Sequence, residues 1–290
     1  MNRYEIYSKR LVWSGAFLLT ALMAGCGGGG DGGGTPAGGG PNPLPAAGPA
    51  HYDFGAAASF GAGSGGGVHN TGLSSAVTGN LGTSAAATTI TGLHDAATGS
   101  YTETAANAGS VSGTIFTDTT PAGDNHATAD AVVAALTKAS VDLSPATATG
   151  GTEPNAATPG VLGGLTLAPG VYNSAAAFDI TAGDLTLDAQ GNPDAFWILQ
   201  APALTVGDST TPRNVILANG ADAKNVYWWI AGPAVVNAAG GGTMNGTVFV
   251  QGSSLDIGGG TATTTLNGRA FIFGGAAINM MNTVITTPAP

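Results

Sequence analysis

The feature that most constrains the fold is a recurring pattern of short β-type segments and small-residue corners in residues 162–285. Four aromatic or apolar segments (196–199, 226–230, 247–250 and 269–273) are each followed by a corner of Gly, Ala, Pro or Ser and then by a short apolar triplet. A repeat of about 20–30 residues with several strands per unit is typical of a β-solenoid. Because one turn cannot bury its own apolar face, the turns must stack on one another.

The tightest copy of the pattern is the segment 243–250, which recurs as 265–272, an offset of 22 residues. Segments 77–83 and 111–115 carry similar Gly-rich β patterns, and we expect them to form coils of the same solenoid. Residues 84–110 between them fit an insertion that caps an open end. An uncapped end coil would expose the edge of its sheet.

One helix is predicted, from Thr128 to Ser140. Its apolar stripe is formed by Ala129, Val132, Val133 and Leu136, with Ser140 at the polar end, at helical spacing. Asp124 or Asn125 is suited to cap its first turn. A half-apolar helix in a β protein must bury its stripe, so we expect it to lie along one face of the solenoid.

Composition restricts what the protein binds. Charged residues make up 8% of the chain and the formal net charge is −10, which argues against nucleic acid as a partner. Gly contributes 49 of the 290 residues, as tight corners and close stacking of coils require. With so few charges, the polar surface must consist mainly of Thr, Ser and Asn.

The first 50 residues predict export and tethering. A basic start is followed by an apolar run (11–24) too short to span a membrane comfortably, and it ends in Leu-Met-Ala-Gly-Cys at 22–26. This ending resembles a bacterial lipobox, which implies a signal peptide at 1–25 and a lipid on Cys26. Residues 26–50 then form a Gly/Pro-rich tether, and 51–290 the folded domain. The alternative is an ordinary secretory signal with an incidental cysteine.

Several longer motifs occur in a characteristic order. Gly-Asn-Leu-Gly-Thr-Ser (79–84) comes first, then the helix, then the stretches 162–172, 185–198 and 219–228. The chain in this respect resembles the widespread microbial ice-binding protein family over roughly residues 53–285. The resemblance implies a mainly β fold: an irregular three-sided β-solenoid with one long α-helix packed alongside. It also implies that the N-terminal coils lie beside the C-terminal ones.

Active members of that family carry outward Thr and Asn on one flat face. Side chains alternate in and out along a strand, so the centre of each apolar triplet points outward. The centres form one expected column: Thr186, Thr205, Val235, Asp256 and Asn279. The ice-binding positions that the resemblance implies are Thr186, Thr205, Val235, Asn279 and Asn282. Asp208 and Asp256 depart from this pattern, because carboxylates hold their own water strongly.

Other Thr-rich pieces, namely Thr243, Thr247 and the run 261–265, are assigned to corners or neighbouring strands. Thr suits any solvent-facing β position, so no role follows from its presence alone. Two interpretations of the Trp residues are open: Trp197, Trp228 and Trp229 either fill the core or form a platform for a sugar. Adjacent strand residues face opposite sides, which favours core filling for at least one of the pair 228–229.

No constellation predicts catalysis or a metal site. The histidines are scattered and Cys26 is the only thiol, so we expect no metal and no cofactor. Asp208 and Asp256 give weak support for an acid/base pair. Asp184, Asp188 and Asp194 suit turns better than a calcium site. The four histidines are His51, His69, His94 and His126.

The resemblance therefore implies a non-enzymatic protein that adsorbs to ice through a flat solenoid face and inhibits recrystallisation. The alternative is a structural or adhesive cell-surface solenoid that binds a partner or a glycan without ice activity. The expected partners are an ice surface and, through the lipid anchor, a membrane. We expect a monomer at the outer membrane or cell surface.

Overall fold

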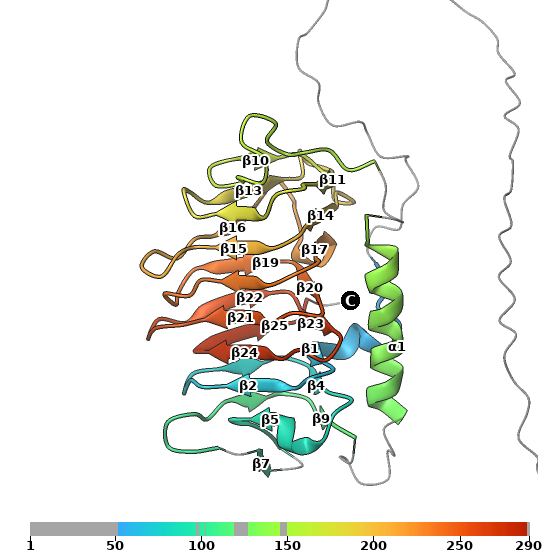
Figure 1. Ribbon diagram of the computed structural model, residues 1–290, viewed down its shortest axis with the longest axis vertical. Helices are drawn as coiled ribbons and strands as arrows, with labels where there is room; N and C mark the ends of the chain where they lie inside the picture. The colour runs from blue at the N-terminus through green and yellow to red at the C-terminus, as the bar shows by residue number, and fades with distance from the viewer. Residues whose placement is uncertain (1–51, 97–98, 102, 119–126, 146–149, 289–290) are drawn as a thin grey trace, which may run out of the picture. The chain divides into compact units, whose positions relative to one another are not determined.

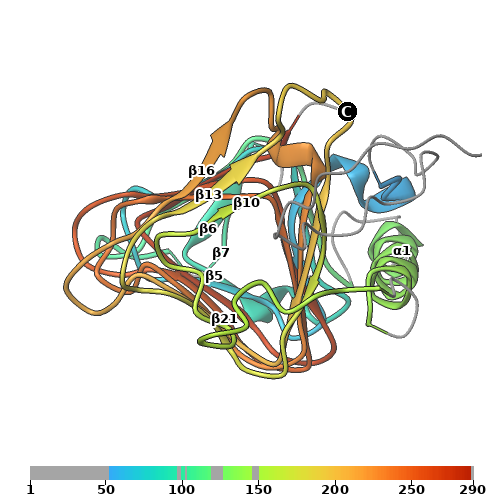
Figure 2. The same cartoon turned by 90° about the horizontal axis from the view of Figure 1, so that it is seen from above.

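A computed structural model describes residues 52–96, 99–101, 103–118, 127–145 and 150–288. The predicted signal peptide, Cys26, the tether, the helix-capping Asp124 and Asn125, and His51 and His126 lie outside these residues. The described chain forms a three-faced β-solenoid with one long helix beside it (Figures 1 and 2). The predicted fold class is confirmed.

Three faces make up the solenoid, and we name them by their sheets. Face A is the sheet β11 (Gly170–Asn173), β14 (Trp197–Ala201), β17 (Val226–Ile230), β20 (Thr247–Gln251), β23 (Ala270–Phe273), β1 (Phe60–Ser64), β4 (Asn80–Gly82) and β9 (Ile115–Phe116). Face B is the sheet β12 (Phe178–Ile180), β15 (Leu204–Val206), β18 (Ala234–Val236), β21 (Leu255–Gly258), β24 (Ile278–Met281), β2 (Val68–Asn70) and β5 (Ile90–Thr91).

Face C consists of two ladders, one above the other in the stack. The first is β10 (Thr166–Leu167), β13 (Leu185–Asp188) and β16 (Val215–Ala218). The second is β19 (Thr243–Asn245), β22 (Thr264–Asn267), β25 (Thr283–Thr286), β3 (Ala76–Val77), β8 (Ser110–Val111), β6 (Leu93–Asp95) and β7 (Gly99–Tyr101). In the described chain these strands pair in parallel, except β6 with β7.

The chain enters the stack in its middle. Strands β1, β2 and β3 pair with β23, β24 and β25, so the N-terminal coil lies directly beside the C-terminal one (Figure 1). From there the chain runs to one end of the stack. Helix α1 (Ala127–Asp142) then lies along the stack, and residues after 150 begin at the far end and wind back to the middle. The expected proximity of the N-terminal coils to the C-terminal ones is confirmed.

The sequence repeat corresponds to the stacking of coils. Thr243 pairs with Thr265 and Asn245 with Asn267, so the 22-residue offset is one coil. Segments 77–83 and 111–115 contribute strands to the same stack, as expected. Residues 84–110 contain η2 (Ala87–Thr89), β5 and the β6–β7 hairpin, which lies at the edge of its sheet. The predicted cap therefore also adds strands to faces B and C.

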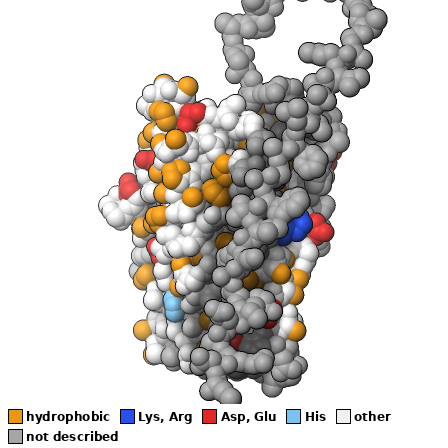
Figure 3. All heavy atoms as spheres, turned by 45° about the vertical axis from the view of Figure 1, so that its right-hand side comes forward, with side chains coloured by type: hydrophobic (Ala, Val, Ile, Leu, Met, Phe, Trp, Pro, Cys, Tyr) orange, Lys and Arg blue, Asp and Glu red, His pale blue; other side chains and the backbone are white. Residues whose placement is uncertain are grey.

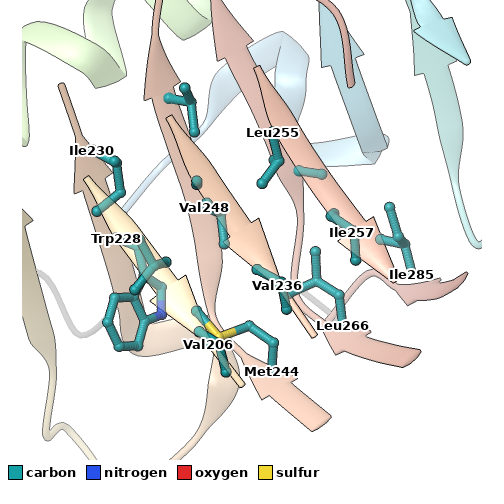
Figure 4. Close-up of a cluster of buried hydrophobic side chains, with 14 of the residues drawn as sticks. Val206, Trp228, Ile230, Val236, Met244, Val248, Leu255, Ile257, Leu266 and Ile285 are labelled. Atoms are coloured by element: carbon teal, nitrogen blue, oxygen red, sulfur yellow. The ribbon is translucent and has the colours of Figure 1, made fainter. Parts of the chain in front are cut away.

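Inward side chains from all three faces fill one core (Figure 4). Trp228, Ile230 and Val248 enter it from face A, Val206, Val236, Leu255 and Ile257 from face B, and Met244, Leu266 and Ile285 from face C. Trp228 is fully buried, and its indole N–H donates to the carbonyl of Asn245 at 3.0 Å. Each large apolar side chain buried in this way contributes about 1.5–3 kcal/mol. The interpretation that the Trp side chains fill the core is confirmed for Trp228 and Trp197, which are both buried.

Close stacking of the coils requires glycine at particular corners. A Cβ on Gly268 would lie 1.9 Å from the carbonyl oxygen of Gly246, and one on Gly246 would lie 2.7 Å from the carbonyl oxygen of Val226. Gly246 also has a φ of +109°, which L side chains rarely adopt. The Asn-Gly steps seen in the sequence thus mark places where one coil touches the next.

Helix α1 covers face A. Val132, Leu136 and Ala139 are buried in one cluster with outward residues of that sheet, including Phe249 and Phe271. Polar bonds fix the helix: the Trp229 indole N–H donates to the Ser140 carbonyl at 2.9 Å, and the Gln200 amide donates to the Leu143 carbonyl at 2.9 Å. The predicted stripe is confirmed except at Val133, which is only partly buried.

The segment before β1 completes the cover. It contains η1 (Gly55–Ser59), and Phe54 stacks on Phe249 with ring centroids 5.8 Å apart. The buried Arg269 guanidinium lies 5.1 Å from the Phe54 ring centroid and donates to the Ala58 carbonyl at 2.8 Å. Face A is therefore an internal interface, and in the described part of the chain faces B and C present partly exposed side chains.

Candidate functional site

Face B carries one outward column along its whole length. Its members pair side by side in the order Asp179, Thr205, Val235, Asp256, Asn279, His69 and Thr91. All are partly or fully exposed. The structure thus places the predicted residues Thr205 and Val235 on adjacent strands, with Asn279 two strands further along.

Thr186 does not belong to this column, and the predicted register is wrong there. Thr186 lies on face C, between Thr166 and Ile216. The face B position in its coil is Asp179, which pairs with Thr205. The triplets around Thr186 and Asp179 have the same in-out-in pattern, so local sequence does not distinguish the two faces. Only the order of strands around the coil does so.

Asn282 is a corner residue and its side chain is already engaged. Its amide oxygen accepts from the backbone N–H groups of Leu73 and Ser74 and from the Ser74 hydroxyl, at 3.0–3.3 Å. Its amide nitrogen donates to the Gly260 carbonyl at 2.7 Å. With a φ of +49°, Asn282 makes a left-handed turn that ties neighbouring coils together. Its geometry is that of a structural link.

Asn279 is also committed to a neighbour. Its amide donates to one oxygen of the Asp256 carboxylate at 2.6 Å, and the Ser254 hydroxyl donates to the other oxygen at 3.1 Å. The central part of face B therefore presents a carboxylate whose partners lie on the protein. Of the five predicted positions, Thr205 and Val235 remain as uncharged, partly exposed side chains in the column of face B.

The suggested acid/base pair of Asp208 and Asp256 is not supported by the geometry. Asp208 lies in the corner after β15, where it accepts from the Thr210 hydroxyl, Thr210 N–H and Thr211 N–H. These bonds, the Thr210 hydroxyl first, lower the pKa of its carboxyl group. Each carboxylate has its own set of partners, and the lowered pKa of Asp208 does not suit a general acid.

Face C carries a different outward column. Its Thr residues were expected, from the sequence, at corners or in neighbouring strands. Its second ladder aligns Thr243, Thr265, Val284, Ala76 and Ser110 on five successive strands. Beside it, Asn245 pairs with Asn267 and Asn267 with Thr286. The 22-residue repeat was the signal that placed Thr243 and Thr265 in one column. What the sequence did not indicate was that their strands belong to an open face.

Amide side chains connect the strands of face C. The Asn267 amide donates to the Asn245 side-chain oxygen at 3.0 Å, and the Asn245 amide donates to the Val215 carbonyl at 2.6 Å. The Asn214 side-chain oxygen accepts from Thr243 N–H at 3.0 Å, while its amide donates to Asp184 at 3.1 Å. Asparagines thus join the two ladders of the face into one continuous surface.

The remaining acidic candidates make turns. Asp188 accepts from Gln190 N–H and from the Asn219 amide, both at 2.8 Å, and these bonds lower the pKa of its carboxyl group. Asp184 accepts from the backbone and the amide of Asn214. Within the described ranges no group of three His, Cys, Asp or Glu side chains is placed to hold a metal ion.

A cavity of about 300 Å³ lies between helix α1 and face A. It is lined by Ser64, Gly65, Gly82, Thr83, Ser84, Ala129, Val132, Val133, Leu136, Thr137, Ile272, Phe273, Gly274 and Gly275. None of these side chains titrates in the range that acid/base catalysis uses. Among the described residues visible in Figure 3, charged side chains are scattered and do not gather in a patch. Among the described residues, no helix is long and apolar enough to cross a membrane.

The sequence model of the Ice-binding-like family matches residues 62–286. Two curated relatives are ice-binding protein 1 of Shewanella frigidimarina, 42% identical over 103 residues, and an ice-binding protein of Nostoc sp. strain HG1, 35% identical over 126 residues. These alignments cover 33% and 42% of this chain. They span only 11% and 42% of the relatives' own lengths.

Two solved structures are similar over nearly the whole described domain. One is an ice-binding protein from an Antarctic biological consortium, with a TM-score of 0.60, 27% identity and coverage of 84% of this chain and 95% of that one. The other is the ice-binding protein of the ascomycete Antarctomyces psychrotrophicus, with a TM-score of 0.61, 26% identity and coverage of 83% and 100%.

The fold and the surface together define a class: a three-faced parallel β-solenoid with one face sealed by a helix and two faces open to solvent. Within that class the family is established by the match, which extends over most of the chain. The chain belongs to the Ice-binding-like family.

Proposed function

We propose that this protein adsorbs to ice through an open face of its solenoid and performs no covalent chemistry. The observation that carries the proposal is a family match over residues 62–286 on a fold whose open faces present residues in straight columns. Parallel strands repeat about every 4.7–4.9 Å, so each column is a regular array. Regular spacing is what a flat crystal surface requires of a binding partner.

The residue types of these columns suit contact with ordered water. A Thr hydroxyl both donates and accepts hydrogen bonds, as each water molecule in ice does. Its methyl group, like those of Val and Ile, borders the same water without binding it. Because Thr, Val and Ile are branched at Cβ, their χ1 angles are restricted and little side-chain entropy is lost on contact. The core that holds the strands is shared by all three faces, which supports a rigid platform.

The proposal is tested by measuring thermal hysteresis, ice-crystal shaping and recrystallisation inhibition with the purified full chain. We expect all three effects, with no change when divalent cations are removed by a chelator. As a matched control, the same chain unfolded in denaturant and diluted into the assay should be inactive until it refolds. A folded chain without hysteresis and without recrystallisation inhibition at high micromolar concentration would instead support an adhesive solenoid.

We also propose that the protein is exported and anchored by a lipid on Cys26, with residues 26–50 as a tether. Support comes from the lipobox-like sequence at 22–26 and from Cys26 being the only cysteine of the chain. A monomer held in this way would face the medium at the outer membrane or cell surface. Mass spectrometry of the mature N-terminus tests the lipid directly. A Cys26→Ala variant should be lost from the membrane fraction, while a retained variant would contradict the anchor.

A further inference from the structure

We propose that the ice-contacting surface of this chain is a neutral patch on face C, and that face B is not the contact. This inference rests on the proposed ice adsorption and specifies its site. We define the neutral patch by the outward residues of strands β19, β22, β25, β3 and β8. They are Thr243, Thr265, Val284, Ala76 and Ser110, together with Asn267 and Thr286 beside them.

The patch is accessible. Ser110 and Thr286 are exposed, and Thr243, Thr265 and Val284 are partly exposed. By contrast, the outward side chains of face A are buried under the helix, as Phe249 and Phe271 show. Five strands at about 4.7–4.9 Å spacing give the patch a length of about 20 Å. That length is enough for several rows of ordered water.

Charge separates the patch from face B. None of the seven residues of the neutral patch ionises. Face B places Asp179 and Asp256 in its central column, with only Thr205 and Val235 between them. His69 follows two strands beyond Asp256 in the same column. From Asp179 to Asn279, the column of face B therefore has at most two neighbouring strands with uncharged outward residues, those of Thr205 and Val235.

The charge difference decides which face matches ice. A carboxylate only accepts hydrogen bonds, and it orients every neighbouring water with a hydrogen toward itself. Ice needs each oxygen to accept and to donate, so water around a carboxylate does not continue the lattice. Removing that water is costly for an ionised group. A neutral hydroxyl or amide carries no such penalty, so the neutral patch is the better template.

The patch is also held rigid. Asn267 donates to Asn245, which is largely buried and donates in turn to the Val215 carbonyl at 2.6 Å. On face B the corresponding amide, Asn279, is bound to the carboxylate of Asp256. Hydrogen bonds within a surface reduce the entropy lost on binding, provided that the groups left outward are those that the partner needs. In the column from Thr243 to Ser110 on face C the outward groups are hydroxyls and methyls.

The patch has clear limits. Towards one end of the stack, His94 pairs with Ser110 and its Nδ1 lies 2.6 Å from the Glu103 carboxylate, so charge begins there. Towards the other end, Asp184 and Asp188 flank the triplet of β13. The proposal therefore concerns the five strands of the second ladder from β19 to β8, which lie between these charges. Thr166 and Thr186, although on the same face, lie beyond that boundary.

The test compares matched bulky substitutions on the two faces in the full chain. Thr265→Tyr places a large side chain on the second of the five strands of the neutral patch, and Thr205→Tyr places the same side chain in the column of face B. Circular dichroism and thermal unfolding check that both variants fold. We expect Thr265→Tyr to lose most of the thermal hysteresis and Thr205→Tyr to retain it. Val284→Asp is the second variant, since it adds charge of the kind found on face B.

The outcomes separate this inference from the proposed function. Activity in the unsubstituted chain with loss only in Thr205→Tyr would overturn the inference and assign the contact to face B. Activity that survives both Tyr substitutions and Val284→Asp would also overturn it, leaving ice adsorption intact. An unsubstituted chain that folds but shows no hysteresis would overturn the proposed function and the inference together. Loss in Thr265→Tyr or Val284→Asp, with Thr205→Tyr active, supports the patch.

Discussion

Faces B and C share one backbone design but differ in what they present to solvent. Both consist mainly of parallel strands around the same core, and both have outward columns at the same strand spacing. Face B interrupts its column with Asp179 and Asp256, whereas face C runs through Thr243, Thr265, Val284, Ala76 and Ser110 without a charge. The backbone therefore supplies the regular array, and the outward residue types decide which array matches ice.

The largest expected effect concerns what the two faces have in common. Trp228 is fully buried among side chains from all three faces, so Trp228→Ala should lower the free energy of unfolding by about 3–5 kcal/mol. Urea unfolding measures the loss. Trp229→Ala is the matched control, because that side chain points outward under the helix and is only partly buried. Equal losses in both variants would contradict a single shared core.

High pH should unfold faces B and C together by acting through face A. Burial raises the pKa of the Tyr227 hydroxyl to about 12, from about 10 in an unfolded chain. The folded protein holds this proton more tightly, so stability is intact below pH 10 and is lost as pH rises toward 12. The loss is on the order of 2–3 kcal/mol. Chemical denaturation at several pH values measures it.

Tyr227→Phe provides the control for this pH dependence. The substitution removes the ionising hydroxyl and should flatten the slope between pH 10 and 12. Part of the slope should remain, because the pKa values of Tyr52 and Tyr172 are also raised, in each case chiefly by burial. A slope that is unchanged in Tyr227→Phe would show that another group controls alkaline unfolding.

Asparagines on the two faces should differ in their importance for stability. Asn245→Ala removes a buried amide that joins Asn267 to the Val215 carbonyl, and we expect a cost of about 1–3 kcal/mol. Asn279→Ala on face B removes an exposed amide and should change stability by only about 0.5 kcal/mol or less. Thermal unfolding of both variants compares them. A larger loss for Asn279→Ala would reverse the assignment of face C as the more tightly organised surface.

The smallest change in stability should come from neutralising face B. Asp179→Asn and Asp256→Asn keep an oxygen that accepts from Thr181 N–H and from the Asn279 amide, respectively. The double variant should therefore differ from the parent by about 0.5 kcal/mol or less. If charge is what excludes face B from ice contact, the double variant should show more thermal hysteresis than the parent. Adding the same two substitutions to the Thr265→Tyr variant should restore some of its activity. Hysteresis that stays the same in both backgrounds would show that charge is not the deciding difference.

Several features followed from the sequence alone because their causes are local. The 22-residue repeat predicts stacked coils, since each coil needs a neighbour to bury its apolar residues. Alternation in short triplets identifies inward residues such as Leu204 and Val206, and helical spacing identifies the buried stripe with Val132 and Leu136. These patterns depend on period and on hydrophobicity, which a single sequence displays. The family resemblance likewise depended on motifs that lie in order along the chain.

The identity of the open faces was decided only by the tertiary structure. The triplets around Thr186 and Thr205 look alike, yet one lies on face C and the other on face B. Asn282 is a residue type expected at an ice-binding site, but its hydrogen bonds to Ser74 and Gly260 show that it holds a corner together. The column Thr243, Thr265 and Val284 becomes a surface only when its strands stack and helix α1 covers face A instead. Which face stays exposed to solvent depends on contacts between residues far apart in the chain, so the local hydrophobic periodicity of the sequence does not predict it.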